Sequence, residues 1–367
     1  MKERILLVSS GGLKKSGVPS VMMTVVEGLS DRYCFDILLH SRTTDYFESR
    51  FLACGGRVFR FPKKHFGFKP LDRIAEVLRP LELYRFTRKL IRKNGPYKAI
   101  HCNNDFDSSG CVSAAKKESI PIRICHTHKS WNPDSETGII TRLYRKACRK
   151  AILSDSTALI GCSSYANLSS FGKDSNAGVL LNPYDEKRFS PSLPLNNPPG
   201  LNMIQVGYFS PLKNQLFTVE VFKKLKESRP DAHLTLVGDR SGEYGQRVEN
   251  ALNESGLGNA VTLLPADADI PKEMEKSSIL ILPSKSEGFG IVLVEAQAMG
   301  LHCFASDSVP KETDRGGVRF LSLSDGADAW AEAILSVKSL LDKKVQDCSV
   351  FSTESFLKSV DHLYSGT

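Results

Sequence analysis

Short apolar runs alternate along the chain with longer segments in which apolar residues recur every three or four positions. The short runs suit buried strands, and the spaced pattern is typical of helices that pack one face on a core. This alternation predicts parallel sheets covered by helices on both faces. In the first half we expect a helix at residues 18–29 and strands at 4–9, 35–40, 58–61, 99–102, 122–126 and 158–162.

A second alternating set begins at Leu201, after a stretch with four prolines at residues 190–200 that we expect to be a linker. With 367 residues, the chain has the length of two domains. We therefore expect an α/β protein whose two Rossmann-like, doubly wound domains, residues 1–189 and 201–345, face a central cleft. The expected strands are 203–206, 233–237, 261–264, 279–282 and 302–305, and the expected helices 215–227, 246–255, 327–341 and 354–364.

The chain carries no signal for membrane insertion or for disulfides. No apolar run approaches the roughly 18 residues that a membrane span needs, and the run after Lys2 and Arg4 is too short for a signal peptide. The nine cysteines include no C-x-x-C pair, so neither a disulfide framework nor a zinc site is expected. These features predict a cytoplasmic protein with reduced thiols.

The net charge of +8 is unevenly distributed. Residues 1–190 hold 32 Lys and Arg against 18 Asp and Glu, whereas residues 191–367 hold 17 against 23. Two segments, 81–93 and 138–153, place apolar residues on one helical face and basic residues on the other. We expect the apolar faces to pack on their own domain and the basic faces to be exposed, where they suit anionic lipid headgroups. The acidic second half and the absence of a basic stripe with interleaved aromatics argue against nucleic acid.

The most informative segment is 279–300, in which an apolar strand leads through a short loop into a helix. A helix start favours phosphate, and Gly288 and Gly290 allow a ligand to approach the backbone closely. Glu295 lies about 7 Å along the helix from Gly290, roughly the distance from a nucleotide's diphosphate to its ribose. The segment is therefore expected to hold a nucleotide diphosphate between Glu287 and Glu295. The alternative is that both acids are ordinary solvated residues.

Other motifs are compatible with several roles. Lys213, at the entrance of a helix, suits a diphosphate but equally suits solvent. His126 and His128 end a strand, where His126 is either a hydrogen-bond partner of a sugar or a structural residue. The pair Asp267 and Asp269 is a D-x-D, which some enzymes use for a divalent cation, but Asp269 is better placed as a helix cap.

The glycine-rich loop at residues 9–17 lacks the motifs of a P-loop and of a dinucleotide fold. It is either a mobile loop at the cleft or an ordinary turn.

Taken together, these segments resemble those of bacterial family-4 glycosyltransferases of the exopolysaccharide or capsular-polysaccharide type. The strongest match is residues 283–300, which contain the family's Glu-x7-Glu motif at Glu287 and Glu295, and residues 295–301 are similar to the polysaccharide subgroup in particular. Residues 125–128, 181–185 and 206–214 support the resemblance, which covers nearly the whole chain.

The resemblance implies a GT-B fold in which a final helix, within residues 346–367, crosses back to the first domain. It implies transfer of a sugar, with retention of configuration, from a nucleotide-sugar donor in the second domain to an acceptor in the first. No metal or other cofactor is implied. The acceptor is expected to be a lipid-linked saccharide, which would place the protein on the inner face of the cell membrane.

The resemblance also implies residue roles. Glu295 would bind the donor ribose, Glu287 and His126 the transferred sugar, and Lys213 the leaving diphosphate. Gly12 and Gly17 would shape the acceptor loop. The remaining residues expected at the donor are Tyr208, Asn214, Gly288, Phe289, Gly290, Ile291 and Val292.

One position departs from the family pattern. Tyr208 stands where the family usually has an arginine that shares the diphosphate with the lysine, so either Arg240 or Arg315 substitutes or catalysis is weak. Two alternatives are therefore retained: a nucleotide-sugar epimerase with the same architecture, and a weakly active or non-catalytic glycosyltransferase-like subunit.

Overall fold

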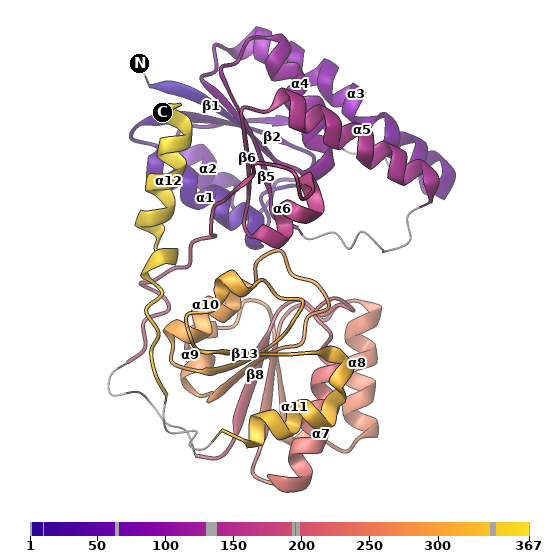
Figure 1. Cartoon of the computed structure of the whole chain (residues 1–367), viewed down its shortest axis with the longest axis vertical. Helices are drawn as coiled ribbons and strands as arrows, with labels where there is room; N and C mark the ends of the chain where they lie inside the picture. Colours follow the sequence, from indigo (N-terminus) through magenta and orange to yellow (C-terminus); the bar gives the residue numbers. More distant parts are fainter. Residues whose placement is uncertain are drawn as a thin grey trace. The chain divides into compact units, whose positions relative to one another are not determined.

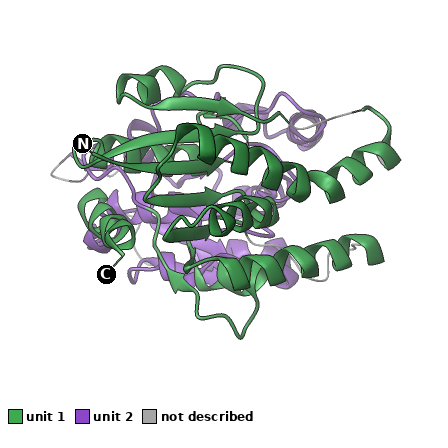
Figure 2. Cartoon of the chain, turned by 90° about the horizontal axis from the view of Figure 1, so that it is seen from above, with its two compact units in different colours: residues 1–182, 353–367 green, residues 183–352 purple. Residues whose placement is uncertain are grey.

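A computed structural model describes residues 2–9, 11–62, 66–129, 138–192, 195, 199–337 and 343–366. The chain divides into two compact units (Figures 1 and 2). Unit 1 comprises Met1–Asn182 and Thr353–Thr367, and unit 2 comprises Pro183–Ser352. The chain therefore leaves unit 1 once and returns to it for its last helix.

Unit 1 is built on a seven-stranded parallel sheet with the order β3-β2-β1-β4-β5-β6-β7. Its inner strand β1 is buried from Ile5 to Ser9, as expected for a strand covered on both faces. The strands are β1 (Glu3–Ser9), β2 (Tyr33–Leu39), β3 (Arg57–Arg60), β4 (Ala99–Asn103), β5 (Ile122–Thr127), β6 (Ala158–Gly161) and β7 (Gly178–Val179).

Helices cover both faces of this sheet. Ile5 and Leu7 pack on α1 and α12, whereas Leu6 and Val8 pack in a core to which α3, α4 and α5 contribute. Side chains thus alternate between two cores along one strand. The helices are α1 (Gly17–Leu29), α2 (Glu48–Ala53), α3 (Lys69–Asn94), α4 (Ser108–Lys117), α5 (Ile139–Asp155), α6 (Ser164–Phe171) and α12 (Thr353–Ser365).

Unit 2 repeats this plan with a six-stranded parallel sheet of order β10-β9-β8-β11-β12-β13. Helices α7, α8 and α11 share one core with the sheet, and α9 and α10 share the other. The strands are β8 (Asn202–Val206), β9 (His233–Val237), β10 (Val261–Leu264), β11 (Ile279–Leu282), β12 (His302–Ser306) and β13 (Val318–Leu321). The helices are α7 (Gln215–Ser228), α8 (Glu243–Glu254), α9 (Ile270–Glu275), α10 (Ile291–Ala298) and α11 (Gly326–Leu335).

The structure corrects several expectations. The boundary between the units falls after Asn182, so residues 183–189, expected in the first domain, belong to unit 2. Residues 193, 194 and 196–198 of the expected linker lie outside the described residues, as do residues 338–342 of the helix expected at 327–341. Strands β7 and β13 were not expected, and α3 begins at Lys69 rather than near residue 81.

The amphipathic interpretation of α5 is partly wrong. Ile139, Ile140 and Leu143 were expected to pack on the domain but are 60–67% exposed. The buried positions of this helix are Cys148 and Ile152. Among the described residues, no helix combines the length and apolarity that crossing a bilayer requires.

Candidate active site

The candidate donor site lies where the strand order of unit 2 reverses. β8 is paired with β9 on one side and with β11 on the other, although β11 comes third after it in the chain. Connections from neighbouring strands diverge at such a switch point, and ligands of α/β sheets bind beyond the carboxyl ends of the strands there. Lys213 lies in the loop after β8 and Glu287 in the loop after β11.

The structure brings Lys213 and Glu287 together. Nζ of Lys213 lies 2.5 Å from Oε1 of Glu287, and the two side chains are only 17% and 10% exposed. The hydroxyl of Ser284 donates to the same carboxylate oxygen at 2.7 Å. This pair places one positive and one negative group side by side at the switch point, groups of the kind that bind a charged or hydroxylated ligand.

Backbone contacts fix the loop that carries Lys213. The amide nitrogen Nε2 of Gln205 donates to the Lys213 carbonyl at 2.8 Å. Asn214 adopts a left-handed conformation (φ 59°) before α7, and its Nδ2 donates to the Pro283 carbonyl at 3.1 Å. The Lys285 N–H donates to the Leu212 carbonyl at 2.8 Å. These bonds tie the loop after β8 to the loop after β11, so both sides of the site are positioned together.

Helix α10 begins at the same loop. Gly290 precedes it with φ +88°, a conformation that favours glycine, and a Cβ there would lie 3.1 Å from Cγ1 of Val309. Phe289 is buried with its ring centroid 5.9 Å from that of Phe351, and Val292 is 7% exposed. Ile291, the first helical residue, is partly buried. Gly288 to Val292 therefore form the amino-terminal turn of a helix, a place that favours anions.

Glu295 lies within α10 and is partly buried. Burial raises its pKa to about 7, while the nearby Arg188 lowers the pKa and Asp185 raises it. A carboxyl group with this pKa changes its charge near neutral pH, so its ability to accept two hydroxyl hydrogen bonds depends on pH.

The structure shows the contacts of Tyr208 and of the two arginines expected to replace the missing one. Its side chain is 56% exposed, and its carbonyl accepts from Nε2 of Gln215 at 3.1 Å. Of the two arginines expected to substitute for the missing one, Arg240 pairs with Glu249 at 2.8 Å and Arg315 donates through Nε to the Asp347 carbonyl at 3.1 Å.

In unit 1, His126 belongs to a buried array of aromatic side chains. Its Nδ1 lies 3.2 Å from Nε2 of His101 on β4, and Nδ1 of His101 lies 2.8 Å from the Tyr364 hydroxyl on α12. The ring of His128 lies 3.9 Å from that of His126, and its Nε2 bonds Oδ1 of Asn103 at 2.8 Å. Among the described residues, Nε2 of His126 and Nδ1 of His128 have no hydrogen-bond partner.

Burial makes these histidines poor bases. Desolvation lowers the pKa of His101 and of His128 to about 3 and holds the pKa of His126 well below its usual value, with the neighbouring histidines acting in the same direction. All three rings are therefore neutral at pH 7, and each has one N–H donor and one acceptor nitrogen.

The remaining predicted residues have simple positions. A Cβ on Gly12 would lie 1.5 Å from Oδ2 of Asp45, so a larger residue there would have to displace that carboxylate, whereas nothing lies within 4 Å of a Cβ on Gly17. Asp269 occupies the cap position of α9, as expected, but its side chain makes no capping hydrogen bond. In the part of the chain that the structure describes, no group of His, Cys, Asp or Glu has the arrangement of a metal site.

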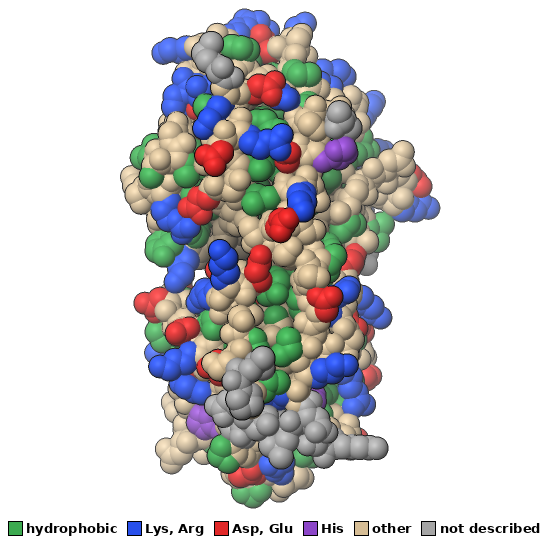
Figure 3. All heavy atoms as spheres, turned by 90° about the vertical axis from the view of Figure 1, so that its left-hand side faces the viewer, with side chains coloured by type: hydrophobic (Ala, Val, Ile, Leu, Met, Phe, Trp, Pro, Cys, Tyr) green, Lys and Arg blue, Asp and Glu red, His purple; other side chains and the backbone are tan. Residues whose placement is uncertain are grey.

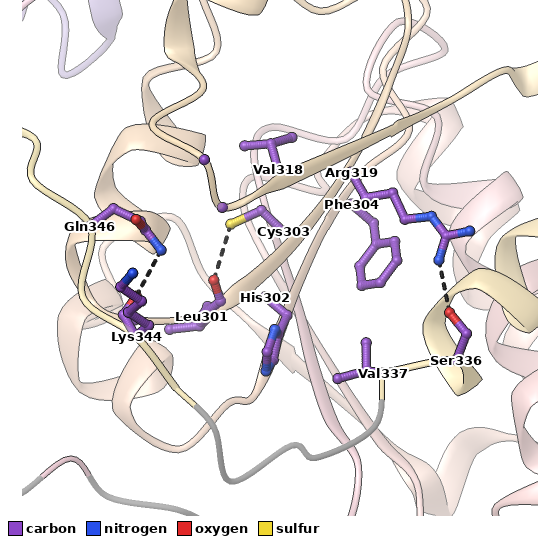
Figure 4. Close-up of a pocket in the computed structure, with 13 residues that line it drawn as sticks. Leu301, His302, Cys303, Phe304, Val318, Arg319, Ser336, Val337, Lys344 and Gln346 are labelled. Atoms are coloured by element: carbon purple, nitrogen blue, oxygen red, sulfur yellow. Dashed lines mark hydrogen bonds between the residues drawn. The ribbon is translucent and has the colours of Figure 1, made fainter.

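One cavity of about 430 Å³ lies elsewhere in unit 2 (Figure 4). It is lined by His302 and Val318, the first residues of β12 and β13, and by Lys344 and Gln346. Ligands of parallel sheets bind at the opposite, carboxyl ends of the strands. This cavity is therefore separate from the candidate donor site.

Several residues of the two constellations were not identified from sequence. Ser284 could have been found from its place three positions before Glu287. His101 could have been found as a histidine near the end of a predicted strand. Tyr364 is 263 positions from His101, and no local pattern links them.

Comparison with known proteins identifies the chain. Residues 185–349 match the family model of glycosyl transferases group 1. EpsF of Bacillus subtilis (strain 168), which carries a glycosyltransferase name, is 30% identical over 91% of this chain and 87% of its own length. An Escherichia coli protein named UDP-Gal:alpha-D-GlcNAc-diphosphoundecaprenol alpha-1,3-galactosyltransferase is 34% identical over 28% of this chain and 27% of its own length.

Among solved structures, that of Anabaena Alr3699/HepE in complex with UDP covers 100% of both chains with a TM-score of 0.76 at 16% identity. At this identity the likeness concerns the fold, and it confirms the expected GT-B architecture of two parallel-sheet domains. The sequence match over nearly the full length and the family model together lead to one assignment: the chain belongs to the group 1 glycosyl transferases.

Proposed function

We propose that the protein transfers a sugar, with retention of its anomeric configuration, from a nucleotide-sugar donor to a lipid-linked saccharide. The relative that acts on a diphosphoundecaprenol-linked sugar supports the choice of acceptor, and the relative crystallised with UDP supports a nucleotide-linked donor. Such an acceptor is presented at a membrane surface, so we place the protein on the inner face of the cell membrane.

The observation that carries the proposal is the pairing of Lys213 with Glu287 at the switch point of the unit 2 sheet, beside the first turn of α10. A diphosphate would be held by the Lys213 ammonium and by the positive end of the helix. Glu287 would accept a hydroxyl of the transferred sugar, and Glu295 the ribose hydroxyls. These roles match the resemblance of residues 283–300 residue by residue.

The proposed reaction needs no protein nucleophile. The bond between the anomeric carbon and the diphosphate oxygen breaks while the acceptor oxygen forms a new bond on the same face of the sugar. The acceptor proton passes to the leaving diphosphate oxygen. Lys213 and the α10 terminus offset the charge that develops on the diphosphate, a contribution typically worth about 3–4 kcal/mol for one well-placed group.

In this proposal His126 binds a hydroxyl of the transferred sugar. Its unpartnered Nε2 is the only polar atom of that ring not already bonded to a described residue. A neutral imidazole at the end of a strand orients a hydroxyl rather than removing a proton, in keeping with its strongly lowered pKa.

A donor screen tests the proposal. The purified chain is incubated with individual nucleotide sugars and a lipid-linked saccharide, and both glycosylated product and released nucleoside diphosphate are measured. We expect product with one donor and a donor KM at least tenfold higher for Glu295→Ala, because the variant loses a contact to the ribose. Donor incubated alone would reveal an epimerase as an isomerised sugar. Unchanged transfer by Glu295→Ala would show that the donor site is elsewhere.

A further inference from the structure

Large apolar side chains are exposed together at one end of unit 1. In and before the first half of α3, four of them are 46–59% exposed, and two at the start of α5 are 60% and 62% exposed. Water-exposed apolar clusters of this kind mark interaction surfaces more often than single exposed residues do. We call this cluster the apolar tip, which consists of Phe68, Leu71, Ile74, Leu78, Ile140 and Leu143.

The exposure follows from the lengths of the helices. α3 has 26 residues and α5 has 17, whereas α4, which packs against both, has only 10. A Cβ on Gly110 of α4 would lie 2.1 Å from the Pro80 carbonyl oxygen, so α4 meets α3 at its middle. Arg88 then pairs with Glu118, which shows that the two helices run in the same direction. The turns of α3 before Pro80 therefore extend beyond the start of α4.

The same holds for α5. The Tyr144 hydroxyl donates to Asp107, just before α4, at 3.3 Å, so the first turn of α5 also lies beyond α4. Nη2 of Arg73 donates to Oγ1 of Thr141 at 2.8 Å and joins the two projecting helix ends. Figure 1 shows α3 and α5 extending together past α4 on the right-hand side of unit 1. The apolar tip is thus one projecting surface built by two helices.

Basic residues follow directly behind the tip. On α3, Arg85 and Lys89 are exposed and continue the spacing of Leu71, Ile74 and Leu78. On α5, Arg142 and Lys146 are exposed beside Ile139 and Leu143. Together the two helices contain thirteen Lys and Arg residues against four Asp and Glu residues. Exposed Glu76 is the one acidic group of these four that is fully at the surface; Asp72, Glu82 and Asp155 are partly buried.

We propose that the apolar tip docks unit 1 on an anionic lipid bilayer. The apolar tip projects, and basic residues lie behind it. This arrangement fits a bilayer, because the apolar groups can enter the acyl boundary while the cations meet the phosphate headgroups. A second copy of this chain fits less well, since its own tip would bring like charges together. Figure 3, which draws the left-hand side of the view in Figure 1, shows apolar side chains mixed with acidic and basic ones.

The proposal extends the proposed function, because a lipid-linked acceptor would be reached from such a surface. It also revises the expectation drawn from sequence, which assigned lipid contact to basic helix faces alone. Several of those basic groups are engaged within the protein: Arg88 and Arg92 pair with Glu118, and Arg149 donates to the carbonyls of Ser169 and Ser170.

The test is flotation of the full chain with vesicles containing about one-third phosphatidylglycerol, compared with pure phosphatidylcholine vesicles. We expect binding to the anionic vesicles that falls at least tenfold in the triple variant Ile74→Ser/Leu78→Ser/Leu143→Ser. Arg142→Gln/Lys146→Gln should weaken binding about fivefold for each charge removed. The thermal unfolding temperature should stay unchanged, because these side chains are exposed.

A matched triple variant controls for the loss of surface apolarity. Leu52, Leu153 and Leu168, also in unit 1, are 42–50% exposed but lie outside the tip, and replacing all three by serine should leave vesicle binding unchanged.

Three results would overturn the proposal: no binding to anionic vesicles, an equal loss of binding in the control variant, or a dimer in solution that only the tip variant converts to a monomer. Transfer to a short water-soluble acceptor, measured in the same variants, separates the two proposals. If that transfer persists while the chain ignores vesicles, only the docking surface is wrong.

Discussion

At the scale of single residues, the candidate site in unit 2 is built around one ion pair. Lys213 and Glu287 neutralise one another at 2.5 Å, and a diphosphate with its greater negative charge would compete for the same ammonium. Glu287 would then be released to accept a sugar hydroxyl, with Ser284 keeping its carboxylate in place. Phosphate binding and sugar recognition are coupled through one ion pair in this scheme.

Donor affinity is predicted to depend on pH through Glu295. Its pKa, raised to about 7 by burial, means that the carboxylate form that best accepts ribose hydroxyls is lost as pH falls below 7. The dissociation constant of UDP, measured by calorimetry between pH 5.5 and 8, should rise by up to tenfold per pH unit below that pKa.

The control for this prediction is Glu295→Gln, which cannot ionise. The ratio of the two dissociation constants at each pH removes the titration of the nucleotide itself. A ratio that stays constant across the range would contradict a role of this carboxylate in donor binding.

The histidine array predicts a role for Tyr364 in positioning His126. A phenol is the stronger donor and an imidazole nitrogen the stronger acceptor, so the Tyr364 hydroxyl donates to Nδ1 of His101. Nε2–H of His101 then donates to Nδ1 of His126, which leaves Nε2 of His126 protonated. Tyr364→Phe should mix the two tautomers and lower kcat about fivefold to tenfold with little change in donor KM.

Nitrogen-15 spectra of the histidine side chains measure the tautomer of His126 directly. If Tyr364 had a purely structural role, Tyr364→Phe would not change this tautomer. Tyr33→Phe is the matched control. It removes a hydroxyl from the same core, where the Tyr33 ring centroid lies 5.5 Å from that of Tyr364, but its partner is Asp361 rather than the array. Equal spectra and rates in the two variants would refute the positioning role.

At the scale of elements, the candidate donor site depends on how strands pass into helices. The loops after β8 and β11 are joined by Asn214 and Lys285, and α10 begins at a glycine with a positive φ. A shift of either loop would therefore move Lys213, Glu287 and the helix start together.

Gly290→Ala is expected to destabilise the protein and to weaken donor binding. A side chain at φ +88° costs about 1–2 kcal/mol, and the contact of 3.1 Å with Val309 adds to it. Gly316→Ala is the control, because Gly316 has φ +91° but nothing within 4 Å of its Cβ position. In urea unfolding, Gly290→Ala should lose more stability than Gly316→Ala. In UDP calorimetry, only Gly290→Ala should lose affinity. Equal effects at the two glycines would mean that the close packing of Gly290 is unimportant.

Some elements are easier to predict from sequence than others, for physical reasons. Strand β11 lies where its continuous apolar run placed it, because both faces of this inner parallel strand are buried. β13 was missed because Arg319 interrupts its short apolar run. In α5 the rule that the apolar face packs inward failed, since Cys148 and Ile152 face the core and Ile140 faces outward.

The same contrast applies to the candidate site. Lys213, Glu287 and Glu295 had local signals in strand–loop–helix segments, and the structure places the first two in contact. Arg188 and Asp185, the charges that act on Glu295, lie more than a hundred positions before it in the chain. Tyr364 and His101 are also separated by more than a hundred positions. Contacts of this separation depend on the topology, which periodicity alone does not specify.

At the scale of the whole molecule, the stabilities of the two units depend on pH in opposite ways. Unit 1 contains three buried neutral histidines with lowered pKa values, and unit 2 contains Glu295 with a raised one. The unfolded chain binds protons at histidine below about pH 6.5, whereas the folded unit 1 does not until far lower pH. Glu295 acts in the opposite sense, because its stabilising proton is present below about pH 4.5 and is lost as pH rises through 7.

We therefore predict that unit 1 loses stability as pH falls from 7 to 5. Each of the three histidines contributes a slope of up to about 1.4 kcal/mol per pH unit below pH 6.5. The measurement is thermal unfolding of the full chain at pH 7.5, 6.5 and 5.5. His128→Asn should reduce the slope by about a third. Acid-independent unfolding of the parent chain would contradict the buried, neutral state of the array.

The return of the chain to unit 1 has a consequence for how the protein is made. Phe356, Val360 and Tyr364 complete the core between β1 and α1, yet the ribosome adds them only after all of unit 2 has been synthesised. Until these residues are added, part of one face of the unit 1 sheet is left uncovered. Unit 2 by then already contains all of its strands. A chain that stops before Thr353 would thus hold all six strands of unit 2 but lack part of the core of unit 1.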